Sequence, residues 1–333
     1  MSETILVFDL GGTQLRAGLF CAAKQRLIAQ VRASSDVVRG DGDYLPRLKT
    51  ALVDLAAALD GPAPNAVSMA VPGPVHGGVV ERLPSLLGPS YQGGLDFVAL
   101  GQELWPGLPV VACNDLTAAG HRYVARGHQD FGVLTLGSGV GGKLFINGRP
   151  LLGVAGYGGE IGHWRVPGAP PIRCDCGGVG HLSALASGRG VLRLTQWTAE
   201  QDPSGFAASR VTRATGPNPG DLTAEAITAA FHGGDPWVTS VMEVAAQALG
   251  AGIAVCALAA GLDLFFLTGG FAVGAGEAFR RRVCIAAGEH AWGMDQDWGA
   301  MVRLAEAGEE PGLDGAGFYA LAHIRRTKSP QGK

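Results

Sequence analysis

FGVLTLGSGVGGKLFINGRPLLGVAGYGGEIGH, residues 131–163, joins two strand-like runs to two clusters of glycine. The first run ends at Leu136, the glycine-rich segment 137–142 follows, and the second run begins at Lys143. Backbone N–H groups of residues without a Cβ can converge on an anion. We therefore expect the segment 137–142 to bind phosphate, a short distance before the carboxylate of Glu160 and the imidazole of His163.

The same glycines, Gly137, Gly139 and Gly142, match the G-x-G-x-x-G pattern of dinucleotide-binding proteins. That pattern needs a helix after the glycines, because the pyrophosphate binds at the helix N-terminus. Here a strand-like run follows and ends at Asn147-Gly148, a turn pair typical of β-hairpins. A hairpin loop over a phosphate is therefore favoured over NAD binding, and an ordinary glycine-rich hairpin stays open while this segment is considered alone.

The composition bounds the class of protein. The chain has 333 residues, of which 47% are hydrophobic and 17% are charged, and this profile indicates a soluble protein with room for two domains. The net charge is −3 and no Lys/Arg run precedes the tail, which argues against a nucleic-acid partner. The N-terminus shows no basic leader, and no run of about 20 apolar residues indicates a membrane span. We expect a cytoplasmic protein without a membrane partner.

The cysteines divide into two groups. Cys21, Cys113, Cys256 and Cys284 lie in apolar surroundings and are expected to be small buried residues. Cys174 and Cys176 share a polar, glycine-rich loop, a pattern that favours a metal site over a disulfide.

Near the N-terminus, a buried strand over residues 4–8 is followed by Asp9-Leu10-Gly11-Gly12-Thr13 and a second strand over 15–21. In a tight hairpin of this kind, the N–H groups and the Thr13 hydroxyl can hold phosphate oxygens, while Asp9 can face a hydrated Mg²⁺. An ordinary hairpin turn with an aspartate at its start is the alternative.

The next elements predict a mixed sheet. They are a third strand at 27–33, a helix at 44–59, a strand at 66–71, a helix at 97–104 and a strand at 109–113. Asn114-Asp115 then precedes a helix at 116–126. A helix N-cap needs only one of these two polar residues, so the other is available to accept a proton from an attacking hydroxyl.

The second half is predicted to be largely helical. The predicted helices span 188–197, 223–231, 238–260, 277–287 and 315–325, and Thr223 is predicted to cap the second of them. Strands are expected at 263–267, before the turn Thr268-Gly269-Gly270, and at 301–305. Residues 200–219 are predicted to form a long polar loop, and 325–333 a basic disordered tail.

Six motifs follow one another through most of the chain, namely DLGGT (9–13), VPGPV (71–75), ND (114–115), LGSGVGG (136–142), GGEIGH (158–163) and CDCGGVGH (174–181). In this order they resemble the ROK family of sugar kinases. The resemblance implies an α/β, two-domain actin-like ATPase (ribonuclease H-like) fold with a cleft between the lobes. The expected N-terminal domain spans 1–113 and is joined by a C-terminal helix at about 313–327. The larger domain with the metal loop spans 114–312, and the tail spans 328–333.

The resemblance also implies a function, the ATP-dependent, glucokinase-like phosphorylation of a hydroxyl on a hexose or hexose-like polyol. Asp115 would be the general base, and Asn114, Glu160, His163 and Ser183 would lie at the sugar. ATP and Mg²⁺ would bind at Asp9, Gly11, Gly12, Thr13, Gly137, Ser138, Gly139, Gly141, Gly142, Gly269 and Gly270. A kinase of a cyclitol or an amino sugar is an alternative, and a homodimer is expected. A non-enzymatic, sugar-sensing ROK protein is a further alternative, which the eight residues before Asp9 disfavour because ROK repressors carry a DNA-binding segment there.

Two positions depart from the family pattern. His163, Cys174, Cys176 and His181 are spaced like the family's zinc ligands, but the last ligand is usually cysteine. Histidine is an ordinary zinc ligand, so a structural Zn²⁺ that fixes the loop around His163 is expected. Ser183 stands where the family has an acidic sugar contact. Since a serine cannot accept two strong hydrogen bonds from vicinal hydroxyls, the acceptor is left open among hexoses, deoxy or N-acyl sugars and cyclitols.

Overall fold

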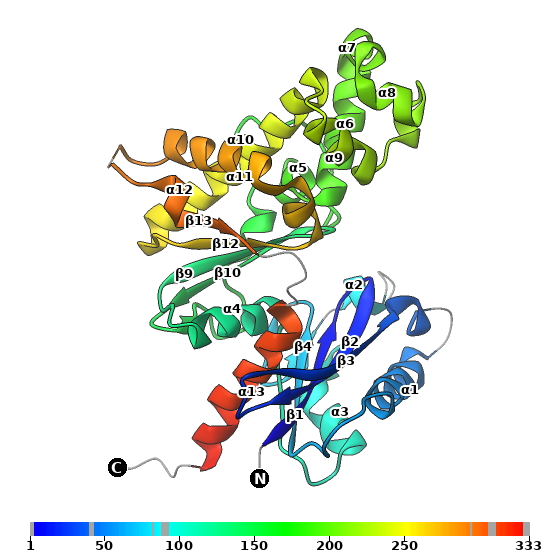
Figure 1. Ribbon diagram of the computed structural model, residues 1–333, viewed down its shortest axis with the longest axis vertical. Coiled ribbons are helices and arrows are strands. Elements are labelled where there is room, and N and C mark those ends of the chain that lie inside the picture. Colours follow the sequence, from blue (N-terminus) through cyan, green and yellow to red (C-terminus); the bar gives the residue numbers. More distant parts are fainter. Residues whose placement is uncertain are drawn as a thin grey trace. The chain divides into compact units, whose positions relative to one another are not determined.

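Two five-stranded sheets, each in a unit of its own, organise the chain in the computed structural model (Figure 1). The structure describes residues 3–39, 43–81, 83–87, 93–293, 295–305 and 311–328. Unit 1 consists of residues 1–129, 152–158 and 310–333, and unit 2 of residues 130–151 and 159–309. The domain boundary after residue 113 stays a prediction, and residues 114–129 belong to unit 1.

The sheet of unit 1 has the order β3-β2-β1-β4-β8. Its strands are β1 (Thr4–Leu10), β2 (Gln14–Cys21), β3 (Arg26–Ser34), β4 (Ala66–Val71) and β8 (Val110–Asn114). The first three form the predicted antiparallel meander, while β4 and β8 run parallel to β1. In this register Asp9 pairs with Ala70 and Ala70 pairs with Cys113, so the ends of β1 and β8 lie at one edge of the sheet.

Both faces of β1 are buried, which explains its unbroken apolar sequence. Leu6, Phe8 and Leu10 pack into one core with helices α1 (Tyr44–Ala57) and α3 (Phe97–Leu104). Ile5 and Val7 pack into the other core with α4 (Asp115–Ala125) and α13 (Pro311–Lys328). Shorter elements complete the unit: η1 (Ser35–Val37), β5 (Val75–His76), β6 (Val79–Val80), α2 (Pro84–Leu87) and β7 (Leu95–Asp96).

The sheet of unit 2 has the order β11-β10-β9-β12-β13. Its strands are β9 (Phe131–Leu136), β10 (Val140–Ile146), β11 (Arg149–Pro150), β12 (Phe265–Thr268) and β13 (Val302–Leu304). The hairpin predicted from the glycine-rich stretch is confirmed, and the strand after the glycines contradicts the dinucleotide alternative. The loop is shorter than predicted, because Gly141 and Gly142 belong to β10 and pair with Thr135 and Leu134.

Helices cover this sheet and bury a single large core. They are η2 (Ile161–His163), α5 (Ser183–Ala186), α6 (Gly188–Gln201), α7 (Pro203–Ala208), α8 (Arg210–Thr215), η3 (Pro219–Asp221), α9 (Ala224–His232), α10 (Pro236–Ala260), α11 (Gly270–His290) and α12 (Trp298–Met301). Helix α10 has the length and hydropathy of a membrane span, but 72% of its most apolar window is buried inside the protein. It is therefore a core helix.

The predicted loop at 200–219 is wrong. The segment forms α7, α8 and η3, because Asp202, Ser209 and Asn218 each accept a backbone hydrogen bond as N-cap residues. The predicted cap at Thr223 is confirmed by its bond from the nitrogen of Ala226, 3.1 Å away.

Two other helices are longer than predicted. Helix α11 starts at Gly270 and is kinked at Gly276 (φ 68°), directly before the predicted start at Glu277. Helix α13 continues to Lys328, so the tail predicted from residue 325 begins no earlier than 329, and residues 329–333 lie outside the described part of the chain.

Candidate functional site

The end of β8 places Asn114 and Asp115 in different roles. Asn114 is the N-cap of α4, since its Oδ1 accepts hydrogen bonds from the nitrogens of Leu116 and Thr117 at 3.0 and 3.1 Å. Its Nδ2 donates to the carbonyl of Gly73 and to Asp115 Oδ1. Asp115 is partly exposed, and its Oδ1 also accepts from the nitrogen of Leu116 at 2.8 Å. Hydrogen bonds from Asn114 and Leu116 therefore hold the Asp115 carboxylate at the helix N-terminus.

Asp9 and Asp115 lie at the same edge of the unit 1 sheet. Both charges act on the buried thiol of Cys113. Burial raises the pKa of this thiol, the charges of Asp115 and Asp9 raise it further, and a backbone hydrogen bond with Ala118 lowers it by less. Asp9 itself is buried and forms an ion pair with Arg16 at 3.0 Å. It also lies against Gly312 of α13, where a Cβ atom would come within 2.8 Å of Asp9 Oδ2.

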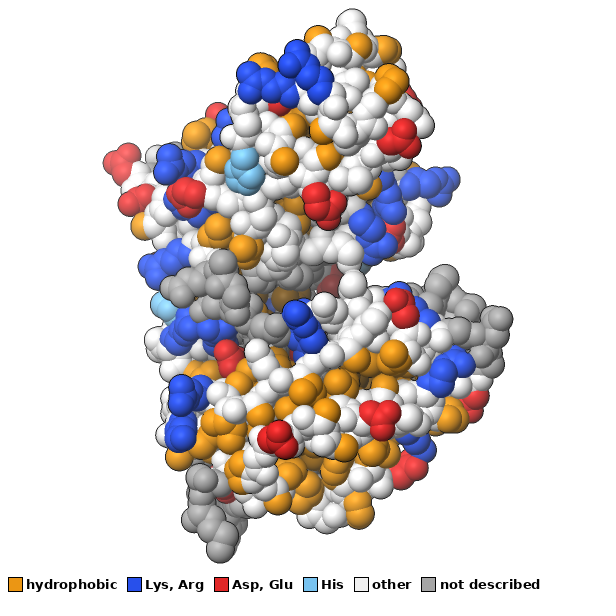
Figure 2. All heavy atoms as spheres, turned by 45° about the vertical axis from the view of Figure 1, so that its right-hand side comes forward, with side chains coloured by type: hydrophobic (Ala, Val, Ile, Leu, Met, Phe, Trp, Pro, Cys, Tyr) orange, Lys and Arg blue, Asp and Glu red, His pale blue; other side chains and the backbone are white. Residues whose placement is uncertain are grey.

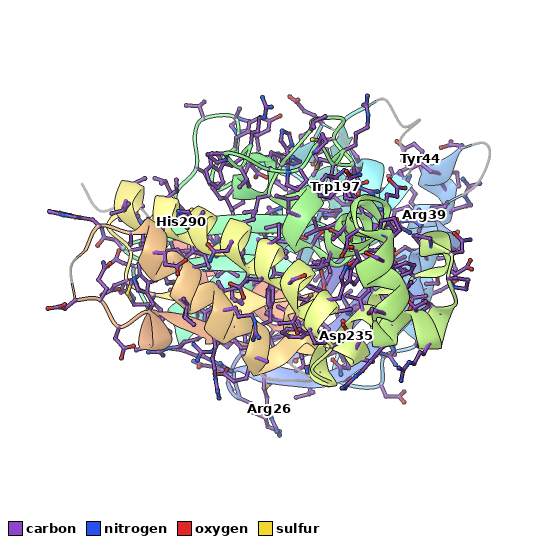
Figure 3. The ribbon with its side chains drawn as sticks, turned by 90° about the horizontal axis from the view of Figure 1, so that it is seen from above. Arg26, Arg39, Tyr44, Trp197, Asp235 and His290 are labelled. Atoms are coloured by element: carbon purple, nitrogen blue, oxygen red, sulfur yellow. The ribbon has the colours of Figure 1, made fainter. Side chains whose placement is uncertain are left out.

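Side chains from elsewhere in unit 1 donate hydrogen bonds to the carbonyl groups of the turn after Asp9. Ser35 Oγ donates to the carbonyl of Gly11 at 2.7 Å, and the guanidinium of Arg39 donates to the carbonyl of Gly12. Figure 3 marks Arg39. In a planar trans peptide the C=O and N–H bonds point in opposite directions. The N–H groups of Gly12 and Thr13 therefore point away from Ser35 and Arg39, as a phosphate-binding turn requires.

The turn between β9 and β10 is built in the same way. The nitrogen of Gly188 donates to the carbonyl of Gly137 at 2.8 Å, and Arg189 Nε donates to the carbonyl of Ser138 at 3.1 Å. The N–H groups of Ser138 and Gly139 therefore point away from the start of α6. The sequence indicated the glycines but not Arg189, Ser35 or Arg39. These residues donate to carbonyl groups far away in the sequence, so they leave no local pattern.

Gly269 and Gly270 lie next to this turn within unit 2. Thr268 pairs with Thr135, which brings the ends of β12 and β9 together. Gly269 has a φ of 93°, and a Cβ atom there would approach the carbonyl oxygen of Leu136 to 2.7 Å. A residue with a side chain would thus push the two turns apart.

The segment with Glu160 and His163 packs directly on β10. A Cβ atom on Gly142 would lie 2.6 Å from the carbonyl oxygen of Gly159, and one on Gly162 would lie 1.9 Å from that of Val140. The missing side chains let the two backbones touch. Glu160 and His163 are exposed, and Glu160 Oε1 lies 2.6 Å from the Nζ atom of Lys143, whose side chain is only 1% exposed.

Ser183 contacts the glycine turn. Its Oγ accepts a hydrogen bond from the nitrogen of Val140 at 3.0 Å, and the side chain lies at the start of α5. The predicted contact of Ser183 with the sugar stays a prediction, as do the site roles of the other residues.

His163, Cys174, Cys176 and His181 form a cluster whose potential ligand atoms all lie within 4.8 Å of one another. Cys176 Sγ and His181 Nδ1 are already 3.1 Å apart, and the loop is closed by backbone bonds between Cys174 and Gly178 and between Ile172 and Gly180. Tetrahedral zinc with nitrogen and sulfur ligands holds its donors about 3.5 Å apart. Two thiols and two imidazoles at this spacing fit such an ion after a small contraction.

The sequence profile of the ROK family matches residues 5–323. The chain belongs to the ROK family. Among its relatives, a C(7)-cyclitol 7-kinase from Streptomyces hygroscopicus subsp. limoneus is 35% identical over 339 residues, which cover 96% of this chain and 94% of that protein.

Two crystal structures of ROK family members resemble this chain over nearly its whole length. The ROK family glucokinase from Streptomyces griseus, in complex with glucose and AMPPNP, has a TM-score of 0.74 at 25% identity and covers 94% of this chain and 97% of its own. The ROK hexokinase from Thermus thermophilus has a TM-score of 0.73 at 28% identity, and the match covers 97% of this chain and 99% of the hexokinase chain. The predicted actin-like ATPase fold is thereby confirmed.

Proposed function

We propose that this ROK family member is an ATP-dependent kinase that phosphorylates a hydroxyl of a sugar or a sugar analogue. The observation that best supports this proposal is the position of Asp115. Its carboxylate is partly exposed at a helix N-terminus, and it lies at the same edge of the sheet as Asp9 and the proposed phosphate turn. Similarity to a C(7)-cyclitol 7-kinase over 96% of the chain makes a seven-carbon cyclitol the first acceptor to test. A hexose is the second, given the likeness to a glucokinase solved with glucose.

In this mechanism, Asp115 accepts the proton of the attacking hydroxyl and orients that oxygen toward the γ-phosphorus. Phosphoryl transfer passes through a loose transition state, so alignment and charge stabilisation supply most of the catalysis. The N–H groups of Gly12 and Thr13, and those of Ser138 and Gly139, are assigned to phosphate oxygens. A positioned base contributes on the order of 10²–10⁴-fold to the rate.

Mg²⁺ would bind through the nucleotide phosphates, with Asp9 holding one of its water molecules. Asp9 is buried and paired with Arg16, so a water-mediated contact fits the geometry better than direct coordination. The metal would neutralise charge on the β- and γ-phosphates.

A structural Zn²⁺ would be held by His163, Cys174, Cys176 and His181. Its effect would be to fix the exposed loop, so that Glu160 and His163 present their side chains to the acceptor. The ring of His181 lies over Gly178, where a Cβ atom would come within 2.2 Å of His181 Cε1, so Gly178 also belongs to this cluster.

The remaining parts of the proposal concern partners and location. On the face that Figure 2 displays, both basic and acidic side chains occur over the surface, in line with a net charge of −3. This pattern supports a small-molecule partner rather than nucleic acid. We further propose a cytoplasmic homodimer.

The proposal is tested by measuring ADP release with ATP-Mg²⁺ across seven-carbon cyclitols, hexoses and N-acyl hexosamines. The substitution Asp115→Asn should lower kcat on the order of 10²–10⁴-fold while calorimetry still detects acceptor binding. Asp96→Asn is the matched control, because Asp96 also lies at a helix start, where its Oδ1 accepts from the nitrogen of Ala99. Full activity of the Asp115 variant would rule out the base assignment, and binding without turnover in the wild type would favour a sugar-sensing protein.

A further inference from the structure

Lys143 is a buried cation in the middle of the sugar kinase motifs. Its side chain is 1% exposed, and it follows Gly142 on β10, in a strand that otherwise buries Val140 and Phe145. A lysine buried to this degree costs several kcal/mol unless a partner compensates its charge. Glu160, 17 residues later, is a partner of opposite charge, with its Oε1 atom 2.6 Å from Lys143 Nζ.

The two sides of this ion pair differ in exposure. The Glu160 side chain is 39% exposed, whereas that of Lys143 is almost fully enclosed. Among the described residues, the Glu160 carboxylate accepts a hydrogen bond from Lys143 Nζ, and the accepting atom is Oε1. Since the Glu160 side chain is also partly open to solvent, an acceptor molecule can reach this carboxylate.

We propose that Lys143 sets the specificity of the acceptor site, holding Glu160 with one oxygen toward the acceptor and selecting uncharged polyols over acceptors that carry an ammonium group. This inference rests on the proposed function, in which Glu160 contacts the acceptor. An unpaired carboxylate attracts an ammonium group strongly. A carboxylate already paired with a lysine forms a neutral unit, and a second cation beside it is repelled by the first.

The ion pair also bears on position 183, where a serine replaces an acidic residue of the family pattern. The ion pair with Lys143 restricts the rotamers of Glu160, so that the carboxylate can offer an oxygen in a fixed position to one hydroxyl of the acceptor. Lys143 is thus a positioning residue, acting on the acceptor through Glu160.

The test compares the wild type with Lys143→Met, a substitution that keeps the length and apolar stem of the side chain. Acceptors are glucose and its 2-, 3- and 4-amino-deoxy analogues, together with a seven-carbon cyclitol and its amine analogue. In the wild type, at least one amine should have a kcat/KM on the order of tenfold below that of its neutral parent. In the variant this ratio should shrink on the order of tenfold, chiefly through KM, with kcat for the neutral acceptor nearly unchanged.

Lys49→Met is the matched control. Lys49 Nζ lies 2.6 Å from Glu103 Oε1, the same separation, but both side chains are at the surface of unit 1. This variant should keep the wild-type ratio. A Lys143→Met enzyme with unchanged KM values and unchanged discrimination would overturn the inference, and so would a loss of kcat for every acceptor alike.

Folding and function are separated by thermal melting. Lys143→Met leaves a carboxylate that water can solvate, so its melting temperature should stay close to that of the wild type. Glu160→Gln removes a negative charge 2.6 Å from the buried ammonium, and its melting temperature should fall below that of Lys143→Met. The reverse order would contradict the inference. A wild type that phosphorylates none of the neutral polyols would contradict the proposed function itself. An active wild type whose acceptor discrimination does not change in Lys143→Met would contradict only the role of Lys143.

Discussion

Ser183 Oγ accepts a hydrogen bond from the backbone nitrogen of Val140 at 3.0 Å. This contact ties the start of α5 to the turn between β9 and β10, and Ser183 lies two residues after His181 of the Cys/His cluster. The serine that replaces an acidic residue of the family pattern is therefore attached to the proposed phosphate turn.

The substitution Ser183→Ala should raise KM for ATP more than KM for the acceptor. It removes a hydrogen bond of about 1 kcal/mol and frees Val140 at the end of the turn, so KM for ATP should rise about fivefold. Steady-state kinetics with each substrate varied in turn measures both constants. Ser204→Ala, an exposed serine of α7, is the control and should change neither. A rise confined to KM for the acceptor would instead support the sugar contact expected from the family pattern.

Zinc removal gives a second prediction. The purified protein should contain one zinc ion per chain, and a strong chelator should lower its melting temperature and raise KM for the acceptor. Thiol titration reports on the ligands directly, because Cys176 is exposed and should react only after chelation. Burial raises the pKa of Cys256 to about 11, so that thiol should stay slow throughout.

Two cysteine variants supply the controls for this prediction. Cys176→Ala should lose zinc, while Cys256→Ala, which removes a thiol outside the cluster, should retain it. A metal-free wild type with full acceptor affinity would contradict the assignment of these four residues to zinc.

The strand, turn and hairpin pattern was predictable because it is local. The predicted ranges of β4 and α3, 66–71 and 97–104, match the structure, since apolar periodicity and flanking turn residues mark their ends. The same local reasoning failed at Asp202 and Ser209, which were interpreted as loop residues although both are helix caps. Proline and polar residues start short helices as readily as they fill loops.

Contacts between distant residues were not predictable from one sequence. The sequence around Lys143 does not indicate an ion pair with Glu160, because the two side chains meet only when the segment around Gly159 packs on β10. The length of the loop between β9 and β10 was overestimated for a similar reason. Gly141 and Gly142 pair as strand residues of β10, and a Cβ atom on Gly142 would meet the backbone of Gly159.

Asp235 gives a prediction about acid stability. It lies at the N-terminus of α10 (Figure 3) and is fully buried. Burial alone would raise its pKa, but the Ser209 hydroxyl and the nitrogens of Val238, Arg210 and Val211 donate hydrogen bonds that bring the pKa below its usual value. A carboxyl with a lowered native pKa stabilises the fold above its unfolded pKa of about 3.9, and this contribution disappears as the pH falls further.

The substitution Asp235→Asn should therefore lower the free energy of unfolding by about 1–3 kcal/mol at pH 7, because buried donors lose an acceptor. The difference from the wild type should shrink as the pH falls below about 3.9, because the carboxyl of the unfolded wild type then binds a proton while the native carboxyl stays charged down to its lower pKa. Urea denaturation at pH 7 and at pH 3.5 measures both effects. The exposed Asp221→Asn should leave both midpoints unchanged, and an equal loss for Asp235→Asn at the two pH values would contradict the linkage.

Gly162 tests whether the contact between β10 and the Glu160 segment sets acceptor affinity. A Cβ atom at Gly162 would lie 1.9 Å from the carbonyl oxygen of Val140, so Gly162→Ala must push the segment off the strand. We expect a loss of about 1–3 kcal/mol in stability and a higher KM for the acceptor. Gly274→Ala is the control, because a Cβ atom there meets no atom within 4 Å and the residue lies in α11. The substitution Gly274→Ala should leave the free energy of unfolding unchanged or raise it by up to about 1 kcal/mol. If both alanine variants melt like the wild type and keep its KM, the close contact at Gly162 does not position Glu160.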